Sequence, residues 1–466
     1  METHIRNYQN SRIHLIGIGG SSMSGLAQML VQESYQVSGS DSVDSHSLQR
    51  LKEMGVDVKA GHHPAMVAGA GLVVYSAAIS SEDPERLAAE CLRIPQMERA
   101  VLLGQLMEGY NHRICISGTH GKTTTGAMVG YTLMKMNHDP TIHIGGRLDS
   151  IGGSTRLGGK EYFIAEACEF NRSFLRMAPT LALLLNVEAD HLDTYGDMEH
   201  VEQAFSDFLN LLPEDGVVVV NAEDERAMKV AQSQSCKVVS FGKDKGDWTY
   251  KITELAGDGA PTFLVYHHGQ KKGVVKLKVA GEFNILHALA TIATVNILKL
   301  NVQEACQAIS SFTAPHRRFE HTGDVQGMKM YHDYGHNPAE MASAIEVALL
   351  QKRRLIAVMQ PHTYSRVISL FDDYLTCTQK ADITLVTDIY AAREKDPGTI
   401  NSQMLVDGMR RHGVKAILTP GFDDVEDWLL TNGREGDLVL TMGCGNINLL
   451  NEQMQRNANA KLMEDQ

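Results

Sequence analysis

The segment Gly118-Thr119-His120-Gly121-Lys122-Thr123 follows an apolar run at residues 113–117 and precedes a helix-like stretch that reaches residue 134. A strand, a glycine turn and a helix in this order are typical of a parallel α/β unit. Gly118 and Gly121 let backbone N–H groups turn toward one anion, and the following helix adds its positive end. The segment therefore predicts a phosphate-binding loop inside an α/β fold.

This loop is shorter than the general motif. The full pattern requires glycine at position 116, where this chain has Ile116. Lys122 would still reach the outer phosphates of a nucleotide, and the Thr123 hydroxyl would hold a magnesium ion. The alternative is an ordinary glycine turn before a helix. Because strand, glycines, Lys-Thr pair and helix coincide, we favour nucleotide binding.

A magnesium ion beside a triphosphate needs more oxygen ligands than one threonine. Glu166 stands at the end of the apolar run 162–165, and Asp190 and His191 follow the run 181–187. Each of these residues alone is more often a solvated turn residue or a structural histidine. Parallel strands that end at one edge of a sheet would bring them to the phosphate loop, which favours metal binding.

A second nucleotide turn is indicated near the N-terminus. Gly17-Ile18-Gly19-Gly20-Ser21-Ser22 follows the strand-like run 13–16, with Ser22 where a dinucleotide turn has its third glycine. Asp41 follows at about the spacing of a ribose-binding acid. Taken alone, the turn also fits an NAD(P)-dependent oxidoreductase. That interpretation leaves the loop at 118–123 unexplained.

The last third of the chain has a doubly wound pattern. Its strand-like runs are residues 354–359, 383–387, 415–418 and 437–442. Polar clusters at 333–336, 361–366 and 388–390 fall where such sheets bind ligands, beyond the carboxyl ends of the strands. Arg317 and Arg318 lie at the junction into this block, as a phosphate clamp or as a solvated linker. Residues 243–278 predict an antiparallel excursion.

Length and composition set further limits. A chain of 466 residues predicts about three domains, which we place at residues 1–108, 109–315 and 316–466. The net charge of −13 argues against nucleic acid or anionic membrane as a partner. Seven scattered cysteines without a C-x-x-C pair, and a polar N-terminus without a signal peptide, predict a cytoplasmic protein.

With these motifs the sequence resembles the Mur ligase family over essentially its whole length. The segment 166–169, Glu-Ala-Cys-Glu, corresponds to the acidic strand-end segment of that family. The other matching segments are Gly17–Gly20 with Met23-Ser24-Gly25, the loop 118–125, Asp190–Asp193, Gly281–Asn284, Arg317–Glu320 and Asp333–His336. The resemblance implies three α/β domains, namely a Rossmann-like N-terminal domain, a central phosphate-loop ATPase-like domain and a Rossmann-like C-terminal domain.

The resemblance also implies a reaction. An ATP-dependent ligase would join L-alanine to the lactyl carboxylate of UDP-N-acetylmuramate through an acyl phosphate, in peptidoglycan precursor synthesis. ATP and Mg2+ would be required, with no nucleic-acid or membrane partner and with a homodimer left open. Two alternatives are a recycling ligase that attaches a ready-made tripeptide to the same nucleotide sugar, and a non-catalytic nucleotide-binding regulator.

Residue roles follow from the same resemblance. It implies catalytic roles for Lys122, Glu166, His191, Arg318 and Asp333, with Thr123, Glu166 and His191 on the metal. It places ATP on Gly118, Thr119, His120, Gly121, Lys122, Thr123, Thr124, Asn284, His287, Arg318 and His336. It places the UDP-sugar on Gly17, Gly19, Gly20, Ser22, Met23, Asp41 and Ser76, and the amino acid near His362 and Arg366.

Five positions depart from the family pattern, and they bear on affinity more than on reaction type. Phe283 and His287 stand where the family usually has histidine and asparagine, so Phe283 would stack on adenine and His287 would hydrogen-bond it. Ser22 replaces a glycine of the uridine turn. Thr363 and Asn446 replace residues that are commonly basic and aspartate, respectively.

Overall fold

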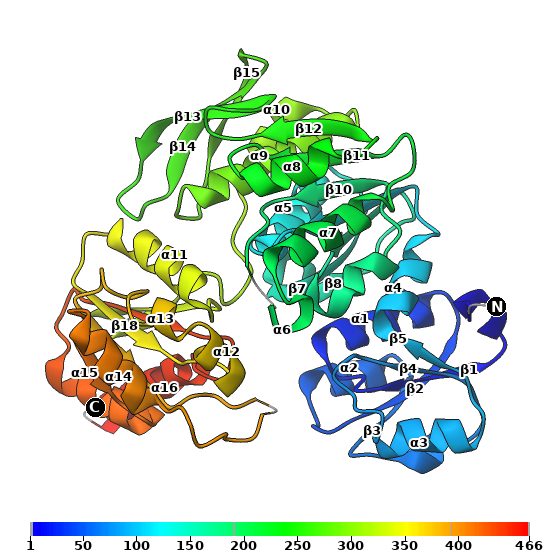
Figure 1. Cartoon of the computed structure of the whole chain (residues 1–466), viewed down its shortest axis with the longest axis horizontal. Helices are drawn as coiled ribbons and strands as arrows, with labels where there is room; N and C mark the ends of the chain where they lie inside the picture. The colour runs from blue at the N-terminus through cyan, green and yellow to red at the C-terminus, as the bar shows by residue number, and fades with distance from the viewer. Residues whose placement is uncertain (1–2, 190–191, 393, 465–466) are drawn as a thin grey trace. The chain divides into compact units, whose positions relative to one another are not determined.

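The computed structural model describes residues 3–189, 192–392 and 394–464. It contains three β-sheets, each with helices packed on it (Figure 1). This architecture confirms the α/β fold with three sheet-containing regions. In the described part of the chain, no helix is both long and apolar enough to cross a membrane.

The first sheet has five parallel strands in the order β3-β2-β1-β4-β5. Its strands are β1 (Arg12–Ile16), β2 (Gln36–Asp41), β3 (Asp57–Ala60), β4 (Ala70–Tyr75) and β5 (Gln96–Glu98). The helices of this region are α1 (Ser21–Gln32), α2 (His46–Glu53), α3 (Pro84–Cys91) and α4 (Arg99–Met107). The second strand runs through Gly39 to Asp41. Gly39 permits this, because a Cβ there would lie 2.5 Å from the carbonyl oxygen of Leu15.

The second sheet has ten strands in the order β15-β14-β13-β12-β11-β10-β6-β9-β7-β8. They are β6 (His112–Ser117), β7 (Thr141–Leu148), β8 (Gly153–Arg156), β9 (Tyr162–Glu166), β10 (Leu181–Leu184), β11 (Val217–Asn221), β12 (Lys237–Phe241), β13 (Trp248–Leu255), β14 (Pro261–His267) and β15 (Gln270–Lys276). Its helices are α5 (Lys122–Lys135), α6 (Leu192–Tyr195), α7 (Met198–Leu209), α8 (Glu225–Gln232), α9 (Phe283–Ile297) and α10 (Val302–Ile309). The antiparallel excursion is confirmed, since β14 and β15 pair in that sense.

The third sheet has six strands in the order β16-β17-β21-β18-β19-β20. They are β16 (Glu320–Val325), β17 (Met328–Asp333), β18 (Leu355–Met359), β19 (Ile383–Val386), β20 (Ala416–Leu418) and β21 (Leu438–Met442). Its helices are α11 (Pro338–Leu349), α12 (Tyr364–Ser369), α13 (Phe371–Tyr374), α14 (Ser402–Arg411), α15 (Phe422–Asn432) and α16 (Asn448–Glu464). Apart from the β16–β17 hairpin, its neighbouring strands run parallel, as the doubly wound pattern predicts.

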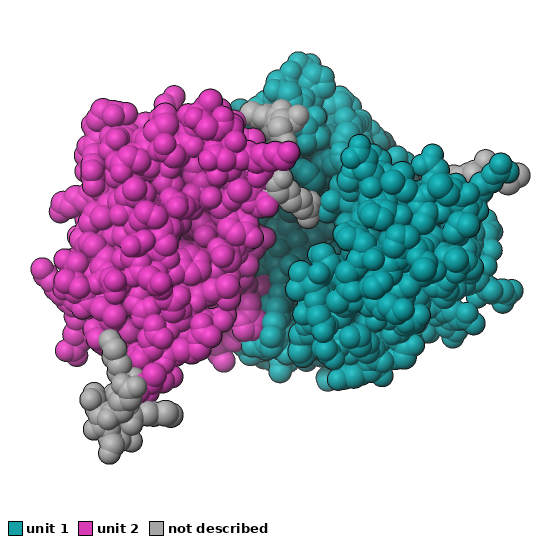
Figure 2. Space-filling view, turned by 90° about the horizontal axis from the view of Figure 1, so that it is seen from below, with its two compact units in different colours: residues 1–253, 262–277, 283–312 teal, residues 254–261, 278–282, 313–466 magenta. Residues whose placement is uncertain are grey.

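Contacts between residues divide the chain into two compact units (Figure 2). The first comprises residues 1–253, 262–277 and 283–312, and the second comprises residues 254–261, 278–282 and 313–466. The first two sheets thus share a unit, and one continuous apolar core extends from Ile13 on β1 to Val220 on β11. The domain limits at 108 and 315 stay predictions.

Helix α1 joins the two sheets of the first unit. It packs on β2 of its own sheet and on β7 and β8 of the second. A Cβ at Gly25 would lie 2.1 Å from the Thr155 hydroxyl, so the helix backbone lies directly against β8. Glycine at this position therefore allows the close approach of the two sheets.

Candidate active site

The loop between β6 and α5 has the backbone that a phosphate-binding loop needs. Gly118 and Gly121 have φ angles of +133° and +83°, in the region that favours glycine. Space is also restricted, because a Cβ at Gly121 would lie 2.4 Å from Cε1 of His287. Both glycines predicted from the sequence are thus required by the local backbone.

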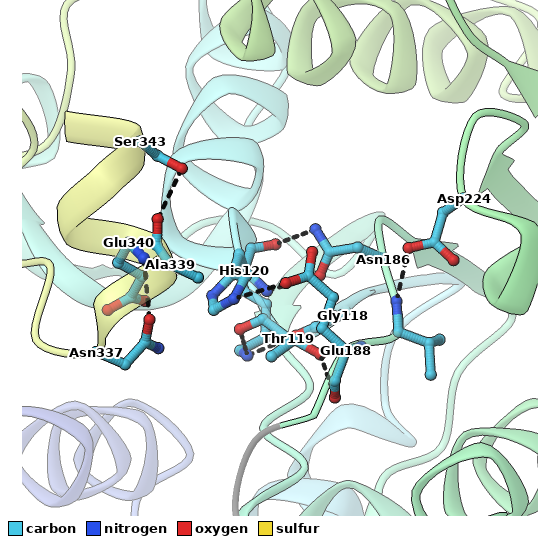
Figure 3. Close-up of polar contacts among 12 residues, drawn as sticks. Gly118, Thr119, His120, Asn186, Glu188, Asp224, Asn337, Ala339, Glu340 and Ser343 are labelled. Atoms are coloured by element: carbon cyan, nitrogen blue, oxygen red, sulfur yellow. Dashed lines mark hydrogen bonds and ion pairs between the residues drawn. The ribbon is translucent and has the colours of Figure 1, made fainter. Parts of the chain in front are cut away.

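Two residues after β10 hold this loop (Figure 3). The backbone N–H of His120 donates to Oδ1 of Asn186 over 2.8 Å, and the amide nitrogen of Asn186 donates back to the His120 carbonyl. Glu188 lies 3.3 Å from Nε2 of His120 and donates its backbone N–H to the Thr119 hydroxyl. We did not predict Asn186 or Glu188, because neither belongs to a recognisable motif of its own.

Lys122 is the first residue of α5, and its ammonium group contacts residues of the same unit. The Nζ atom donates to the carbonyls of Gly118 and Thr119 and lies 2.8 Å from Oε2 of Glu169. The side chains of Lys122 and Glu169 are only 14% and 5% exposed. Burial lowers the pKa of Lys122, but the charge of Glu169 and its hydrogen bond outweigh burial, and the net pKa is raised. Glu169 belongs to the acidic segment noted above, although no site role was assigned to it.

The expected metal ligands Thr123 and Glu166 are neighbours. The Thr123 hydroxyl donates to Oε2 of Glu166 over 3.0 Å, and the backbone N–H of Gly145 donates to the other carboxylate oxygen. Hydroxyl and carboxylate oxygens are the donors that Mg2+ prefers, so this pair fits the ion. Asp190 and His191 lie outside the described residues, and the described residues contain no group of three or more His, Cys, Asp or Glu that could hold a metal.

Helix α9 contributes the residues expected near adenine. Asn284 and His287 are buried, whereas Phe283 is 41% exposed. The His287 ring packs against Gly121, and its Nδ1 atom lies 3.0 Å from the hydroxyl of Thr125 on α5. His287 therefore contacts the phosphate loop and its helix, while its contact with a base stays a prediction. Thr124 is buried on the first turn of α5.

The turn that follows β1 is stabilised by contacts within its own sheet region. Gly17 has a φ of +75°, and the backbone N–H of Gly19 donates to Oδ2 of Asp41 over 2.9 Å. Asp41, at the end of β2, thus stabilises the turn, and its contact with a ribose stays a prediction. Met23 is in the core, and Ser76 directly follows β4.

Ser22 links this turn to the second sheet. Its hydroxyl lies 2.8 Å from Nε2 of His143 on β7 and accepts a hydrogen bond from Arg99 over 3.1 Å. The Nδ1 atom of His143 lies 3.0 Å from the Thr155 hydroxyl. Burial, followed by the charge of Arg99, lowers the pKa of His143 to about 3, so the ring is neutral. Sequence spacing gave no indication of His143 or Arg99.

In the second unit, Arg317 and Arg318 differ in environment. Arg317 donates from Nε to His332 over 3.0 Å and from Nη2 to the Gly445 carbonyl, which makes it a structural anchor. The Arg318 guanidinium lies 5.1 Å from the centre of the Tyr334 ring. The solvated-linker alternative does not describe these two side chains.

Asp333 ends β17 and accepts backbone hydrogen bonds from Phe319 and Gly335 over 2.8 and 2.7 Å. Burial raises the pKa of Asp333, although the charge of Arg318 and the two backbone bonds oppose that rise. His336 lies 3.1 Å from Glu340 at the start of α11. The polar cluster at 333–336 is therefore a network at the end of β17, a strand that the sequence pattern did not indicate.

The residues expected near the amino acid follow β18. Arg366 Nη1 lies 3.1 Å from Nδ1 of His362, and the ring of Tyr390 stacks on His362 at 5.6 Å. Burial and the charge of Arg366 lower the pKa of His362 to about 4. Thr363 has a φ of +61°, and Oδ1 of Asn446 accepts a hydrogen bond from Gln360. The structure thus brings the clusters at 361–366 and 388–390 together.

Comparison with known proteins decides the family. Three family models match, described as "Mur ligase family, catalytic domain" at residues 12–111, "Mur ligase middle domain" at 116–295 and "Mur ligase, glutamate ligase domain" at 317–445. The chain belongs to the Mur ligase family. This result confirms the resemblance inferred from the sequence motifs.

Curated relatives of this Mur ligase match almost end to end. The UDP-N-acetylmuramate–L-alanine ligase of Clostridium botulinum (strain Loch Maree / Type A3) is 42% identical over 94% of this chain and 96% of its own length. The enzyme of the same name from Clostridium novyi (strain NT) is 43% identical, with the same coverage of both chains.

Solved structures agree with this assignment. The UDP-N-acetylmuramate-alanine ligase of Thermotoga maritima gives a TM-score of 0.82 at 25% identity, covering 97% of this Mur ligase and all of that chain, a share of 100%. A murein peptide ligase from Psychrobacter arcticus 273-4 gives 0.71 at 23% identity, covering 96% and 98% of the two chains. The second likeness concerns the fold alone.

Proposed function

We propose that this Mur ligase joins L-alanine to the lactyl carboxylate of UDP-N-acetylmuramate while ATP is cleaved to ADP and phosphate. The observation that carries the proposal is the identity of 42 to 43% with ligases of that name over 94% of the chain. The loop at 118–123 supports the proposal, because two left-handed glycines followed by Lys122 and Thr123 at a helix start suit the phosphates of a nucleoside triphosphate. ATP dependence is common to the family, and a cytoplasmic location belongs to the same proposal.

The chemistry requires activation of the carboxylate, since oxide is too poor a leaving group. A carboxylate oxygen would attack the γ-phosphorus of ATP, and the bond to the ADP oxygen would break to leave an acyl phosphate. The alanine amine would then attack the carbonyl carbon, phosphate would leave, and the nitrogen would lose a proton. Both steps depend on alignment and on neutralised negative charge more than on a covalent nucleophile.

The first unit would supply that neutralisation. Lys122 and the N–H groups of Gly118 to Gly121 would bind the phosphates. Thr123 and Glu166, together with His191, would hold Mg2+, which supplies positive charge against the phosphate oxygens when bound. Glu169 would fix the Lys122 side chain at the start of α5. The turn from Gly17 to Ser22 would take the diphosphate of the nucleotide sugar.

The second unit would complete substrate recognition. We assign Arg318, Asp333 and His336 to the nucleotide. We assign His362 and Arg366 to the carboxylate of the incoming amino acid, since a guanidinium suits that group. The neutral His362 ring would orient Arg366 through the hydrogen bond between them.

Phosphate release tests the proposal directly. Purified protein with ATP, Mg2+ and UDP-N-acetylmuramate should release phosphate when L-alanine is added. Lys122→Met should abolish the release, whereas the exposed Lys229→Met on α8 should not change it. Release driven by a tripeptide instead of alanine would support the recycling ligase. Release with no amino acid selectivity, or ATP binding without turnover, would contradict the assignment.

A further inference from the structure

Arg99 is a cation without an acidic partner in the first unit. It is the first residue of α4, directly after β5, and its Nη1 atom donates to the Ser22 hydroxyl over 3.1 Å. No carboxylate of the described residues lies within 4.0 Å of its guanidinium, and Ser22 is its one hydrogen-bond partner among them. A guanidinium carries five N–H donors, so most of this group is available to a ligand.

The environment of Arg99 favours an anionic ligand. Burial lowers the pKa of Arg99, while the nearby Cys168 and Glu98 raise it. A cation withdrawn from water is stabilised by an anion that accepts its hydrogen bonds. Anionic ligands are also what the adjoining turn from Gly17 to Ser22 suits, at the N-terminus of α1.

A directed chain of hydrogen bonds fixes the position of Arg99. Because Ser22 accepts from Arg99, its own proton is available to Nε2 of His143. That ring nitrogen is then the acceptor, so the proton of the neutral ring is on Nδ1 and is donated to Thr155. His143 and Thr155 are 5% and 4% exposed, which holds the whole chain in place.

Arg99 lies beside the N-terminal turn, because its guanidinium contacts Ser22. Helix α4, which begins at Arg99, also packs on α1, whose N-terminus follows that turn. A nucleotide sugar bound at the turn would therefore bring its anionic groups near the guanidinium.

We infer that Arg99 binds an anionic group of the nucleotide sugar and that Ser22, His143 and Thr155 are its positioning residues. The inference rests on the proposed function for the identity of the nucleotide sugar. The anion is either the diphosphate or the lactyl carboxylate, and the two are separated by the choice of probe.

Calorimetric titration provides the test. UDP-N-acetylglucosamine and UDP-N-acetylmuramate would be titrated into the wild type, Arg99→Gln, Arg99→Lys and the control Arg226→Gln, which alters an exposed arginine on α8. We expect Arg99→Gln to weaken binding roughly 10- to 100-fold, Arg99→Lys to weaken it less, and the control to bind as the wild type does.

The pattern of losses identifies the anion. An equal loss for both probes identifies the diphosphate, and a loss for UDP-N-acetylmuramate alone identifies the carboxylate. Unchanged binding of both probes by Arg99→Gln overturns the inference. If Arg99→Gln fails to fold, Arg99→Met decides, because it keeps the length of the aliphatic part of the side chain and removes the charge, and wild-type affinity for both probes in that variant overturns the inference.

A kinetic test addresses the positioning residues. Ser22→Ala and His143→Phe should raise the KM for the nucleotide sugar several-fold while the KM for ATP stays the same. A merely structural role would lower the melting temperature and leave the ratio of the two KM values unchanged, which would overturn the positioning role. If wild-type protein bound UDP-N-acetylmuramate through Arg99 but did not ligate alanine, the proposed function would fail and the inference about Arg99 would stand.

Discussion

Lys122 is the residue on which nucleotide binding and stability meet. Its ammonium group contacts the carbonyls of Gly118 and Thr119 and the carboxylate of Glu169. These contacts hold the phosphate loop in its folded conformation. Two nearly buried opposite charges stabilise a protein little as a pair, yet removing one of them is costly. The role of Glu169 therefore becomes visible when a Lys122 variant is compared with the variant that also replaces Glu169.

We expect Lys122→Met to lower the free energy of unfolding by roughly 3 kcal/mol, because the Glu169 carboxylate loses its cation in a buried place. The double variant Lys122→Met/Glu169→Gln should regain much of that loss, although neither variant should ligate. Urea unfolding at pH 7 measures both quantities. Equal stability of the single and double variants would show that the two side chains are not coupled.

Residues in motifs were predictable from sequence, and residues fixed by distant contacts were not. The structure has the glycines at 118 and 121, Lys122 and the Thr123–Glu166 pair at the loop, helix start and strand end that the sequence indicated, since these are local features, while their roles with ATP and metal stay predictions. Arg99 and His143 lie far from Ser22 in sequence. The packing of α1 on α4 brings Arg99 to it, and the packing of α1 on β7 brings His143. No spacing rule carries that information.

At the scale of elements, the start of α5 depends on α9. Gly121 caps α5 in a left-handed conformation, and the His287 ring on α9 lies where a side chain would be. Both the backbone angle and the neighbouring ring therefore exclude other residues. The cost of backbone strain and the cost of the clash with His287 can be separated by mutation. Gly152, a left-handed glycine in the same unit, has open space around it and would show the strain alone.

We expect Gly121→Ala to lower the free energy of unfolding by about 1–3 kcal/mol and to weaken ATP binding, because backbone strain and a clash with His287 act together. Gly152→Ala is the matched control, with a φ of +68° and nothing within 4 Å of the added Cβ, and should show the smaller strain alone. Thermal unfolding and nucleotide titration measure the effects. Equal losses in the two variants would mean that the His287 contact contributes nothing.

Strands β1 and β2 and helix α3 share a buried polar network. Glu85 on α3 accepts hydrogen bonds from His14 over 2.9 Å, Ser40 over 2.6 Å and the backbone N–H of His63 over 2.6 Å. Burial alone would raise the pKa of Glu85, but these bonds outweigh it and the pKa lies below its ordinary value of 4.5. The network therefore favours the ionised carboxylate in the folded state.

A carboxylate with a lowered pKa stabilises the fold above its unfolded pKa, and this contribution is lost as the pH falls through the folded value. Glu85→Gln should therefore be less stable at pH 7, and its stability should fall less steeply than that of the wild type below about pH 4.5. Urea unfolding from pH 7 to pH 3 measures the slopes. Glu225→Gln on the exposed face of α8 serves as the control, and a wild-type slope in Glu85→Gln would contradict the linkage.

Element prediction succeeded where strands are apolar and failed where they are polar or rich in glycine. The runs at 162–165, 181–187 and 354–359 contain buried strands in the structure. We missed β7, whose sequence Thr-Ile-His-Ile-Gly-Gly-Arg-Leu contains two glycines, and β17, which alternates apolar with polar residues. Their partners in the sheet stabilise both strands, and sequence patterns do not show those partners.

At the scale of the whole molecule, the chain has three sheets but two compact units. The core shared by the first two sheets makes the N-terminal and central regions one body in energetic terms. The second unit has its own apolar cores on its sheet. Units with separate cores usually unfold in separate transitions.

We expect calorimetry to resolve two unfolding transitions, one for each unit. UDP-N-acetylmuramate should raise the melting temperature of the first unit only. Gly25→Ala should lower the melting temperature of the first unit by several °C, because the added Cβ would lie 2.1 Å from the Thr155 hydroxyl. Gly408→Ala on α14 is the matched change in the second unit, where the Cβ would meet Leu375 at 2.4 Å. A single transition shifted alike by both variants would contradict two energetic units.

The hydroxyl at position 22 has a consequence for how this protein can evolve. Ser22 and His143 stand 121 positions apart, yet they share one hydrogen bond. With glycine at the first position, Nε2 of a histidine at the second would lose the hydroxyl that donates to it, and a buried ring nitrogen without a hydrogen bond lowers stability. Across homologues the two positions should therefore covary, so that mutational drift in β7 is constrained by a turn in the first sheet.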